Sequence, residues 1–265
     1  MKFIHLSDLH IGIRVNDFSM SEDQRYILDR ILDIIDSEAP DGIIIAGDIY
    51  DKSMPPAEAV AMFDDFISSI AERKIKTFII SGNHDSAERI AFGSRIMNAG
   101  GIYLSPVYNG DIKPVVMKDE YGSVNIYMLP FVRPSAVRAF YPDDDTDSYS
   151  SAVGTAVKHM NADFTQRNII ITHQFVTGAV RSDSEDISVG GTDNVSADIF
   201  ADFDYTALGH IHKPQNIGSE RIRYCGTPLK YSFSEAKQDK SVTVIELGKK
   251  GDVNVRTVKL PLRDM

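Results

Sequence analysis

The sequence is poor in the features that mark secreted and membrane-bound proteins. It holds a single cysteine, Cys225, among 265 residues, which excludes an internal disulfide. None of its apolar runs approaches the ~20 residues needed to cross a bilayer. The polar cluster Ser7, Asp8 and His10 would interrupt the hydrophobic region of a signal peptide. These absences predict a cytoplasmic protein that does not enter a membrane.

Positive charge is also scarce, with 28 Lys and Arg against 38 Asp and Glu and a formal net charge of −10. This balance argues mildly against strong autonomous binding of DNA, which usually requires a basic face. It does not exclude DNA, because charge can be segregated and bound cations add local positive charge. The acidic run from Asp143 to Asp147 is interpreted as a solvated loop or helix start. With 43% hydrophobic residues, residues 1–265 are predicted to fold as one domain.

One arrangement recurs along the chain: an apolar strand runs directly into a polar cluster that contains metal-ligand residue types. Near-continuous apolar runs of about four to six residues indicate strands that are covered on both faces. Sites in parallel sheets gather beyond the carboxyl ends of the strands, so the clusters are expected to converge. The five clusters are Asp8 with His10, Gly47-Asp48, Gly82-Asn83-His84, Thr172-His173 and Gly209-His210-Ile211-His212.

Apolar residues at helical spacing predict helices over 21–37 and 55–73, and a capping-box spacing from Asp85 to Glu88 predicts a third over 85–98. Strand–helix alternation near the N-terminus indicates a largely parallel sheet. Residues 115–117 and 124–129 predict a hairpin, and 221–224, 241–247 and 253–260 predict further antiparallel strands. The expected fold is α/β, a four-layer α/β/β/α sandwich of two mixed sheets.

The donor set suits a pair of divalent cations. Imidazole and carboxylate are ligands for zinc, manganese or iron, and a carboxylate can bridge two ions. Because side chains alternate along an extended segment, Asp8 and His10 would point to the same side of their segment, and so would His210 and His212 of theirs. Two ions ~3.5–4 Å apart can activate a hydroxide and stabilise a phosphoryl group in an in-line displacement. The seven predicted ligands are Asp8, His10, Asp48, Asn83, His173, His210 and His212.

These motifs resemble those of the calcineurin-like metallophosphoesterase superfamily. The segments Ser7–Gly12, Gly47–Asp51, Ser81–Asp85 and Gly209–His212 carry that likeness. Two further stretches, 55–60 and 226–235, resemble its DNA-repair branch, the SbcD-type nucleases of SbcCD complexes. The resemblance covers nearly the whole chain.

The resemblance implies a role for each site residue. Asp8, His10 and His212 would hold one ion, and Asn83, His173 and His210 the other, with Asp48 as the bridge. His84 would protonate or stabilise the leaving oxygen. Asp51 would hydrogen-bond the His84 imidazole, unless it is only a loop cap. Asp85 is interpreted as a helix N-cap.

Contacts with substrate are less defined. Arg14, Arg89 and Lys230 could touch phosphates or be ordinary surface cations, and Gln174 could contact the substrate or support the ligands. Tyr231 and Phe233 could stack on a base or pack against the sheet, with packing preferred.

The resemblance also implies partners and a cofactor. They are DNA, an SbcC-type ATPase, a second copy of the chain and two divalent ions, with Mn²⁺ ahead of Zn²⁺, Fe²⁺ or Mg²⁺. The family's capping and ATPase-docking regions are expected to lie beyond the segment at 260–265. Dimer contacts are expected on the helices at 56–72 and 86–98, where Met62, Phe63, Ile90 and Phe92 are the candidates and half of them could belong to the core instead.

Three functions compete at this point. The leading interpretation is a two-metal DNA exonuclease or endonuclease. The second is a phosphodiesterase or phosphatase for a small or protein-bound phosphate, which the acidic net charge favours slightly. A non-catalytic scaffold is the third, although such proteins typically lose a ligand or the catalytic histidine.

Overall fold

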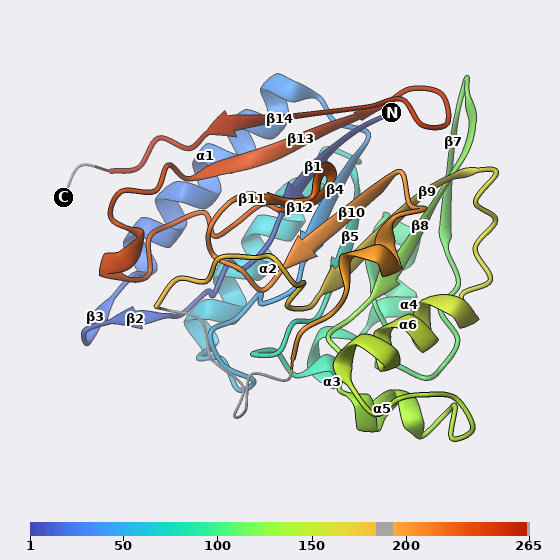
Figure 1. Ribbon diagram of the computed structural model, residues 1–265. Coiled ribbons are helices and arrows are strands. Elements are labelled where there is room, and N and C mark those ends of the chain that lie inside the picture. Colours follow the sequence, from blue (N-terminus) through green and yellow to red (C-terminus); the bar gives the residue numbers. More distant parts are fainter. Residues whose placement is uncertain (184–192, 264–265) are drawn as a thin grey trace.

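Two β-sheets packed face to face form the centre of the computed structural model, which describes residues 1–183 and 193–263 (Figure 1). The first sheet has the order β14-β13-β1-β4-β5-β6. Its four strands β1, β4, β5 and β6 run parallel, while β13 pairs antiparallel with both β1 and β14. The bounds are β1 Lys2–Leu6, β4 Gly42–Ala46, β5 Lys76–Ile80, β6 Ile102–Leu104, β13 Ser241–Leu247 and β14 Val253–Lys259.

The second sheet has the order β11-β12-β10-β9-β8-β7. Its central strands β8, β9, β10 and β12 are parallel, and the edge strands β7 and β11 are antiparallel to their neighbours. The bounds are β7 Val115–Asp119, β8 Gly122–Leu129, β9 Arg167–His173, β10 Tyr205–Gly209, β11 Gln215–Ile217 and β12 Ser219–Tyr224. A small hairpin, β2 Arg14–Val15 with β3 Phe18–Ser19, lies outside both sheets.

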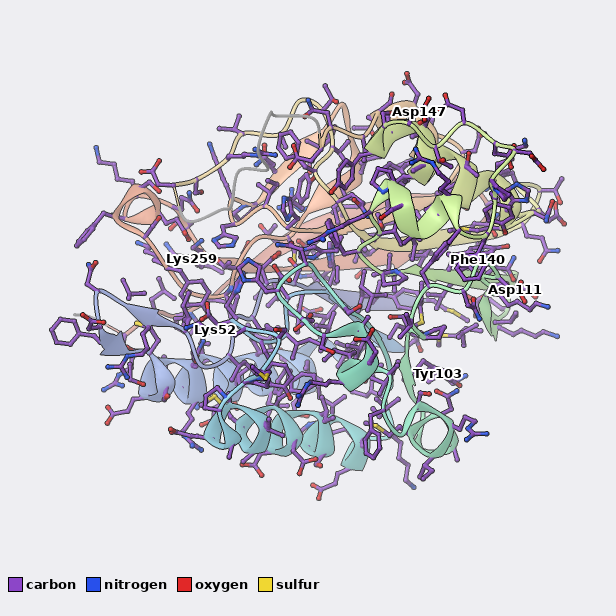
Figure 2. All side chains as sticks on the ribbon, turned by 90° about the horizontal axis from the view of Figure 1, so that it is seen from below. Lys52, Tyr103, Asp111, Phe140, Asp147 and Lys259 are labelled. Atoms are coloured by element: carbon purple, nitrogen blue, oxygen red, sulfur yellow. The ribbon has the colours of Figure 1, made fainter. Side chains whose placement is uncertain are left out.

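Helices cover the outer face of each sheet. Figure 2, viewed from below relative to Figure 1, shows α1 and α2 on one side of the sheets and α5 and α6 on the other. The helices are α1 Ser21–Glu38, α2 Ala57–Glu72, α3 Ala87–Ile90, α4 Ser94–Met97, α5 Pro134–Arg138 and α6 Tyr149–His159, with 3₁₀ turns η1 Asn98–Gly100, η2 Ala197–Phe200 and η3 Phe233–Glu235. No helix in the two described ranges is long and apolar enough to span a membrane.

Three apolar clusters fill the spaces between these four layers. Along β4, Ile43 and Ile45 pack towards α1 and α2, whereas Ile44 packs into the space between the sheets. Along β9, Ile170 faces α6 and Ile169 faces the first sheet. Because successive strand side chains point to opposite faces, a strand buried on both sides must be apolar throughout. This is why the continuous apolar runs predicted the central strands.

The predicted α/β/β/α sandwich is confirmed, as are the helices over 21–37 and 55–73 and the hairpin at β7 and β8. The single helix predicted over 85–98 is wrong. It is divided into α3, α4 and η1, because Gly93 adopts a left-handed φ of 73° between α3 and α4. The N-cap of α3 is Ser86, whose side chain accepts from the Arg89 amide, so the N-cap role predicted for Asp85 is also wrong. The strand at 221–224 is antiparallel to β11 but parallel to β10.

Candidate metal centre

The five polar clusters meet where β1, β4 and β5 of one sheet end beside β9 and β10 of the other. Main-chain hydrogen bonds join the loops: the Asp8 amide donates to the Gly47 carbonyl and the His10 amide to the Asp48 carbonyl, each at 3.0 Å. The His210 amide donates to the Asp8 carboxylate across 3.0 and 3.1 Å. This last bond connects the two sheets at the site itself.

Four of the predicted ligands lie on left-handed backbone. The φ angles are 52° at Asp8, 43° at His10, 48° at Asp48 and 101° at His210. Such conformations cost of order 1–3 kcal/mol for a non-glycine residue and persist where surrounding structure enforces them. The expectation that strand alternation aims Asp8 and His10 is therefore wrong, because β1 ends at Leu6 and the loop conformation sets their direction.

Glycines allow the close approach of these loops. A Cβ on Gly82 would lie 2.1 Å from Asp48 Oδ1, and one on Gly209 would lie 1.9 Å from the Ala46 carbonyl oxygen. Neither contact is physically possible. The glycines directly before Asp48, Asn83 and His210 thus reflect a lack of space in the site.

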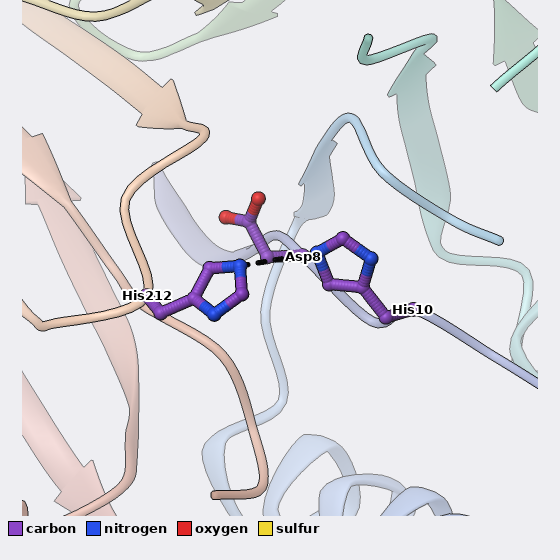
Figure 3. Close-up of side chains that lie close together, drawn as sticks. All are labelled: Asp8, His10 and His212. Atoms are coloured by element: carbon purple, nitrogen blue, oxygen red, sulfur yellow. Dashed lines mark hydrogen bonds between the residues drawn. The ribbon is translucent and has the colours of Figure 1, made fainter. Parts of the chain in front are cut away.

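The first cluster contains Asp8, His10 and His212, drawn in Figure 3. The Nε2 atoms of His10 and His212 face each other at 3.2 Å, and His10 Nε2 lies 3.7 Å from Asp48 Oδ2. All four side chains are buried. Two imidazole lone pairs at this distance repel each other unless a proton or a cation lies between them.

The second cluster is built around the Asn83 amide oxygen. His173 Nε2 and His210 Nδ1 each lie 3.0 Å from Asn83 Oδ1, and His173 Nε2 lies 3.2 Å from Asp48 Oδ2. The other ring nitrogen of His173, Nδ1, donates to the Ala46 carbonyl at 2.8 Å. That bond fixes the orientation of the ring and leaves Nε2 as the atom directed into the site.

The donor atoms have the spacing that a shared cation requires. Metal–nitrogen bonds are about 2.0–2.1 Å long, so two ligands at roughly tetrahedral or octahedral angles stand ~3.0–3.4 Å apart. The distances of 3.0 and 3.2 Å within the two clusters match this spacing. Asp48 contributes to both clusters, as a bridging carboxylate would. The described residues therefore fit a pair of divalent ions.

The electrostatics of the protein without metal agree with this geometry. Burial raises the pKa of Asp48, but His173 beside it holds the net pKa well below the ordinary value. Burial lowers the pKa of His173, yet Asp48 outweighs this effect and raises that pKa to about 9. Burial and the neighbouring His173 lower the pKa of His210 to about 3. His210 is thus a neutral imidazole, the form that binds metal.

His84 lies at the rim of the clusters, with 27% of its side chain exposed and Nε2 4.0 Å from Asp48 Oδ2. Its Nδ1 lies 3.0 Å from the main-chain carbonyl oxygen of Asp51 and donates to it. This contact orients the ring, and the bond from the Asp51 side chain that the sequence suggested stays a prediction. The His84 amide also donates to Asp48 Oδ1 at 2.9 Å.

The residues predicted to contact substrate lie in different settings. Arg89 is exposed and lines a cleft of about 700 Å³ together with Asn83. Arg14 is exposed on the β2–β3 hairpin, where its guanidinium donates to the Asp17 carbonyl. Gln174 is buried and donates to the Val132 carbonyl at 3.4 Å. Of these three residues, Arg89 is the one that lines a cleft together with a predicted ligand, Asn83.

Sequence reasoning missed two residues that hold the loops. Gln24 of α1 donates to the His10 carbonyl at 2.8 Å and accepts from the Gly12 amide at 3.0 Å. A buried polar residue on the apolar stripe of a helix was the available signal. Asp85 accepts from the amides of Ile49 and Gly82 at 3.1 and 2.9 Å, and burial with the nearby Asp48 raises its pKa to about 6.

The segment after β12 also departs from expectation in one respect. Tyr231 packs as preferred: it is buried and donates to the Leu9 carbonyl at 2.6 Å. Phe233 does not pack, because 85% of it is exposed. Lys230 is half-buried and donates to the Ala236 carbonyl.

Comparison with known proteins assigns the class that this geometry indicates. Residues 1–214 match the family described as calcineurin-like phosphoesterase, and the chain belongs to that family. A solved crystal structure that is 15% identical covers 97% of this chain and 98% of its own, with a TM-score of 0.54. At that identity the likeness concerns the fold alone.

Two curated relatives, each named as the SbcD subunit of the nuclease SbcCD, narrow the resemblance. The one from Staphylococcus saprophyticus subsp. saprophyticus is 36% identical over 93% of this chain and 66% of its own length. Its namesake from Staphylococcus epidermidis is 35% identical over 100% of this chain and 71% of its own. The chain thus spans about two thirds of the length of these relatives. The predicted resemblance to SbcD-type nucleases is confirmed.

Proposed function

We propose that this chain is a two-metal DNA nuclease of the SbcD type, which hydrolyses phosphodiester bonds as an exonuclease or endonuclease. The observation that carries the proposal is that Asp48 Oδ2 lies near both His10 of the first cluster and His173 of the second, in a chain about 35% identical to two SbcD proteins over most of its length. In this proposal Asp8, His10 and His212 hold one ion, and Asn83, His173 and His210 hold the other. Asp48 bridges the two.

Two bound divalent cations would supply a hydroxide at neutral pH and neutralise charge on the phosphoryl group. The chain's own contribution is positioning. Because the Asp51 carbonyl accepts from His84 Nδ1, the opposite nitrogen, Nε2, is directed to the site. As an imidazolium, His84 can donate the Nε2 proton to the leaving oxygen.

The cleft beside Asn83 suits an extended, negatively charged strand. It is lined by Arg89, Arg133 and Phe131 as well as by Glu88, and both arginines are exposed. The half-buried Phe131 ring has its centroid 6.4 Å from that of His173. Cationic groups that track a backbone and an aromatic ring that stacks a base are the usual elements of single-strand binding. This local arrangement favours nucleic acid over a small phosphate despite the net charge of −10.

Hydrolysis of single-stranded DNA should be compared with hydrolysis of bis(p-nitrophenyl) phosphate, each with Mn²⁺. Wild-type protein is expected to cleave both, and Asp48→Asn neither. The pair Arg89→Ala and Arg133→Ala is expected to raise KM for DNA and leave the aryl ester unaffected. Cleavage of the aryl ester with no cleavage of DNA would refute the nuclease assignment and support the alternative, a phosphodiesterase for small substrates.

Manganese is the proposed metal, by analogy with the family, although a site of imidazole and carboxylate also suits zinc or iron. The proposed partners are DNA and an SbcC-type ATPase, because both relatives are named as subunits of SbcCD. We place the activity in the cytoplasm, in keeping with the single thiol of Cys225. Anomalous scattering from a metal-soaked crystal would identify the ions and count them.

A second copy of the chain is also proposed as a partner. Met62, Phe63 and Ile90 belong to the core, although Phe63 and Ile90 also line the apolar cleft between α2 and α3. Phe92 lines the same cleft and is 84% exposed, and Ile96 on α4 is 82% exposed. Sedimentation of wild-type protein and of Phe92→Ser/Ile96→Ser should distinguish dimer from monomer, and identical masses would exclude this surface as the interface.

A further inference from the structure

The segment 226–235, one of the two stretches that resemble SbcD-type nucleases, lies directly behind His212. Glu235, the last residue of this segment, and Lys240, which follows it in the chain, form an ion pair. Neither side chain has any exposed surface. Glu235 Oε2 lies 2.5 Å from Lys240 Nζ. A buried ion pair is weak evidence for stability, because a well-packed apolar pair of similar volume often serves equally well. Its position calls for another explanation.

The contacts of this pair converge on one predicted ligand. Glu235 Oε1 lies 3.4 Å from His212 Nδ1. Lys240 Nζ donates to the His212 carbonyl at 3.1 Å and to Thr227 Oγ1 at 2.7 Å. The Thr227 amide also donates to the His212 carbonyl, at 3.2 Å. Both the ring and the main chain of His212 are therefore held from the same segment.

The chemistry of the contact fixes the orientation and tautomer of the ring. Lys240 Nζ donates to Glu235 Oε2, so Glu235 Oε1 is left as the acceptor that faces His212 Nδ1. His212 Nδ1 must therefore donate its proton to Glu235. The lone pair is then on Nε2, which is the atom that faces His10 Nε2 at 3.2 Å. A carboxylate behind a ligating histidine in this way also raises the basicity of the ligand.

We propose that Glu235 is a positioning residue for metal binding through His212, and that Lys240 locks the Glu235 carboxylate in place. This inference rests on the proposed two-metal function and assigns a role to the 226–235 segment. His212 faces His10 in one cluster, whereas His173 and His210 surround Asn83 Oδ1 in the other. The prediction is therefore asymmetric: loss of Glu235 weakens one of the two ion sites and spares the other.

The test measures Mn²⁺ binding to the folded chain by electron paramagnetic resonance and titration calorimetry. Glu235→Gln and the double variant Glu235→Gln/Lys240→Met should each weaken one of two Mn²⁺ sites about 10- to 100-fold. The Mn²⁺ affinity of the other site should change less than about threefold. The double variant leaves no unpaired buried charge, so it folds even if the single variant does not. The matched control is Asp119→Asn, which breaks the ion pair between Asp119 at the end of β7 and Arg167 at the start of β9. It should leave the Mn²⁺ affinity of both sites unchanged.

Unchanged affinity at both sites in the double variant would overturn the inference and leave the pair a purely structural one. Equal weakening of both sites would overturn it as well, because it would indicate general loosening. The proposed function is tested separately by the wild-type chain. Two Mn²⁺ ions with no DNA cleavage would refute the nuclease while leaving the role of Glu235 intact.

Discussion

Replacing Gly209 with alanine tests whether the two sheets are forced together at the metal centre. The added Cβ would lie 1.9 Å from the Ala46 carbonyl oxygen and 2.7 Å from His173 Nδ1. Carbon and oxygen normally approach to ~3.3 Å, so β10 and β4 must separate by more than about 1 Å. The same shift would break the bond from His173 to Ala46, which is 2.8 Å long.

The magnitude follows from that shift. Overpacking a rigid interior costs about 1–3 kcal/mol, which corresponds to a fall in Tm of ~2–10 °C for a chain of this size. Misplacing reacting groups by about 1 Å lowers activity ~100-fold. We therefore expect Gly209→Ala to lose stability, Mn²⁺ affinity and activity together.

The matched control is the same substitution at Gly154 in α6. There the nearest atom to an added Cβ is Ile199 Cδ1 at 3.7 Å, an ordinary contact. Alanine is favoured over glycine in a helix by about 1 kcal/mol, so Gly154→Ala should stabilise the protein. Urea denaturation and Mn²⁺ titration of both variants give the comparison. If Gly209→Ala matched Gly154→Ala in stability and bound two ions, the reasoning about crowding would be refuted.

Three further predictions follow from the same contacts. His84→Ala should lower kcat on DNA by ~10²–10⁴-fold and leave Mn²⁺ affinity unchanged; unchanged kcat would remove His84 from the mechanism. Chelation with EDTA should lower Tm, since ions at 100 times their Kd stabilise the native state by about 2.7 kcal/mol, and an equal Tm with and without chelator would argue against tight sites. The hydrogen bond from Arg167 holds the pKa of Asp119 in the folded protein well below the ordinary value of 3.8. The ionised carboxylate therefore stabilises the fold fully above about pH 4, and this contribution is lost as the pH falls towards the pKa of the folded state. Asp119→Asn should therefore flatten the loss of stability between about pH 4 and pH 2, which urea midpoints measured across this range would detect.

The sequence by itself determined the residue types of the site and the strands that carry them. A strand buried on both faces has to be apolar, and the polar residues that follow it stand out against that background. The order of Asp8, Asp48, Asn83, His173 and His210 could therefore be predicted without coordinates. So could the four layers, because strand–helix alternation and hairpin spacing are local properties of the chain.

Only the tertiary structure decided how those residues are aimed. The left-handed backbone at Asp8 and His210 is enforced by hydrogen bonds between loops about 200 positions apart, such as the one from the His210 amide to Asp8. The carbonyl of Ala46 orients the ring of His173, and Glu235 contacts His212 from a separate segment. Neither local propensity nor spacing encodes such contacts, because they exist only once the two sheets have packed together.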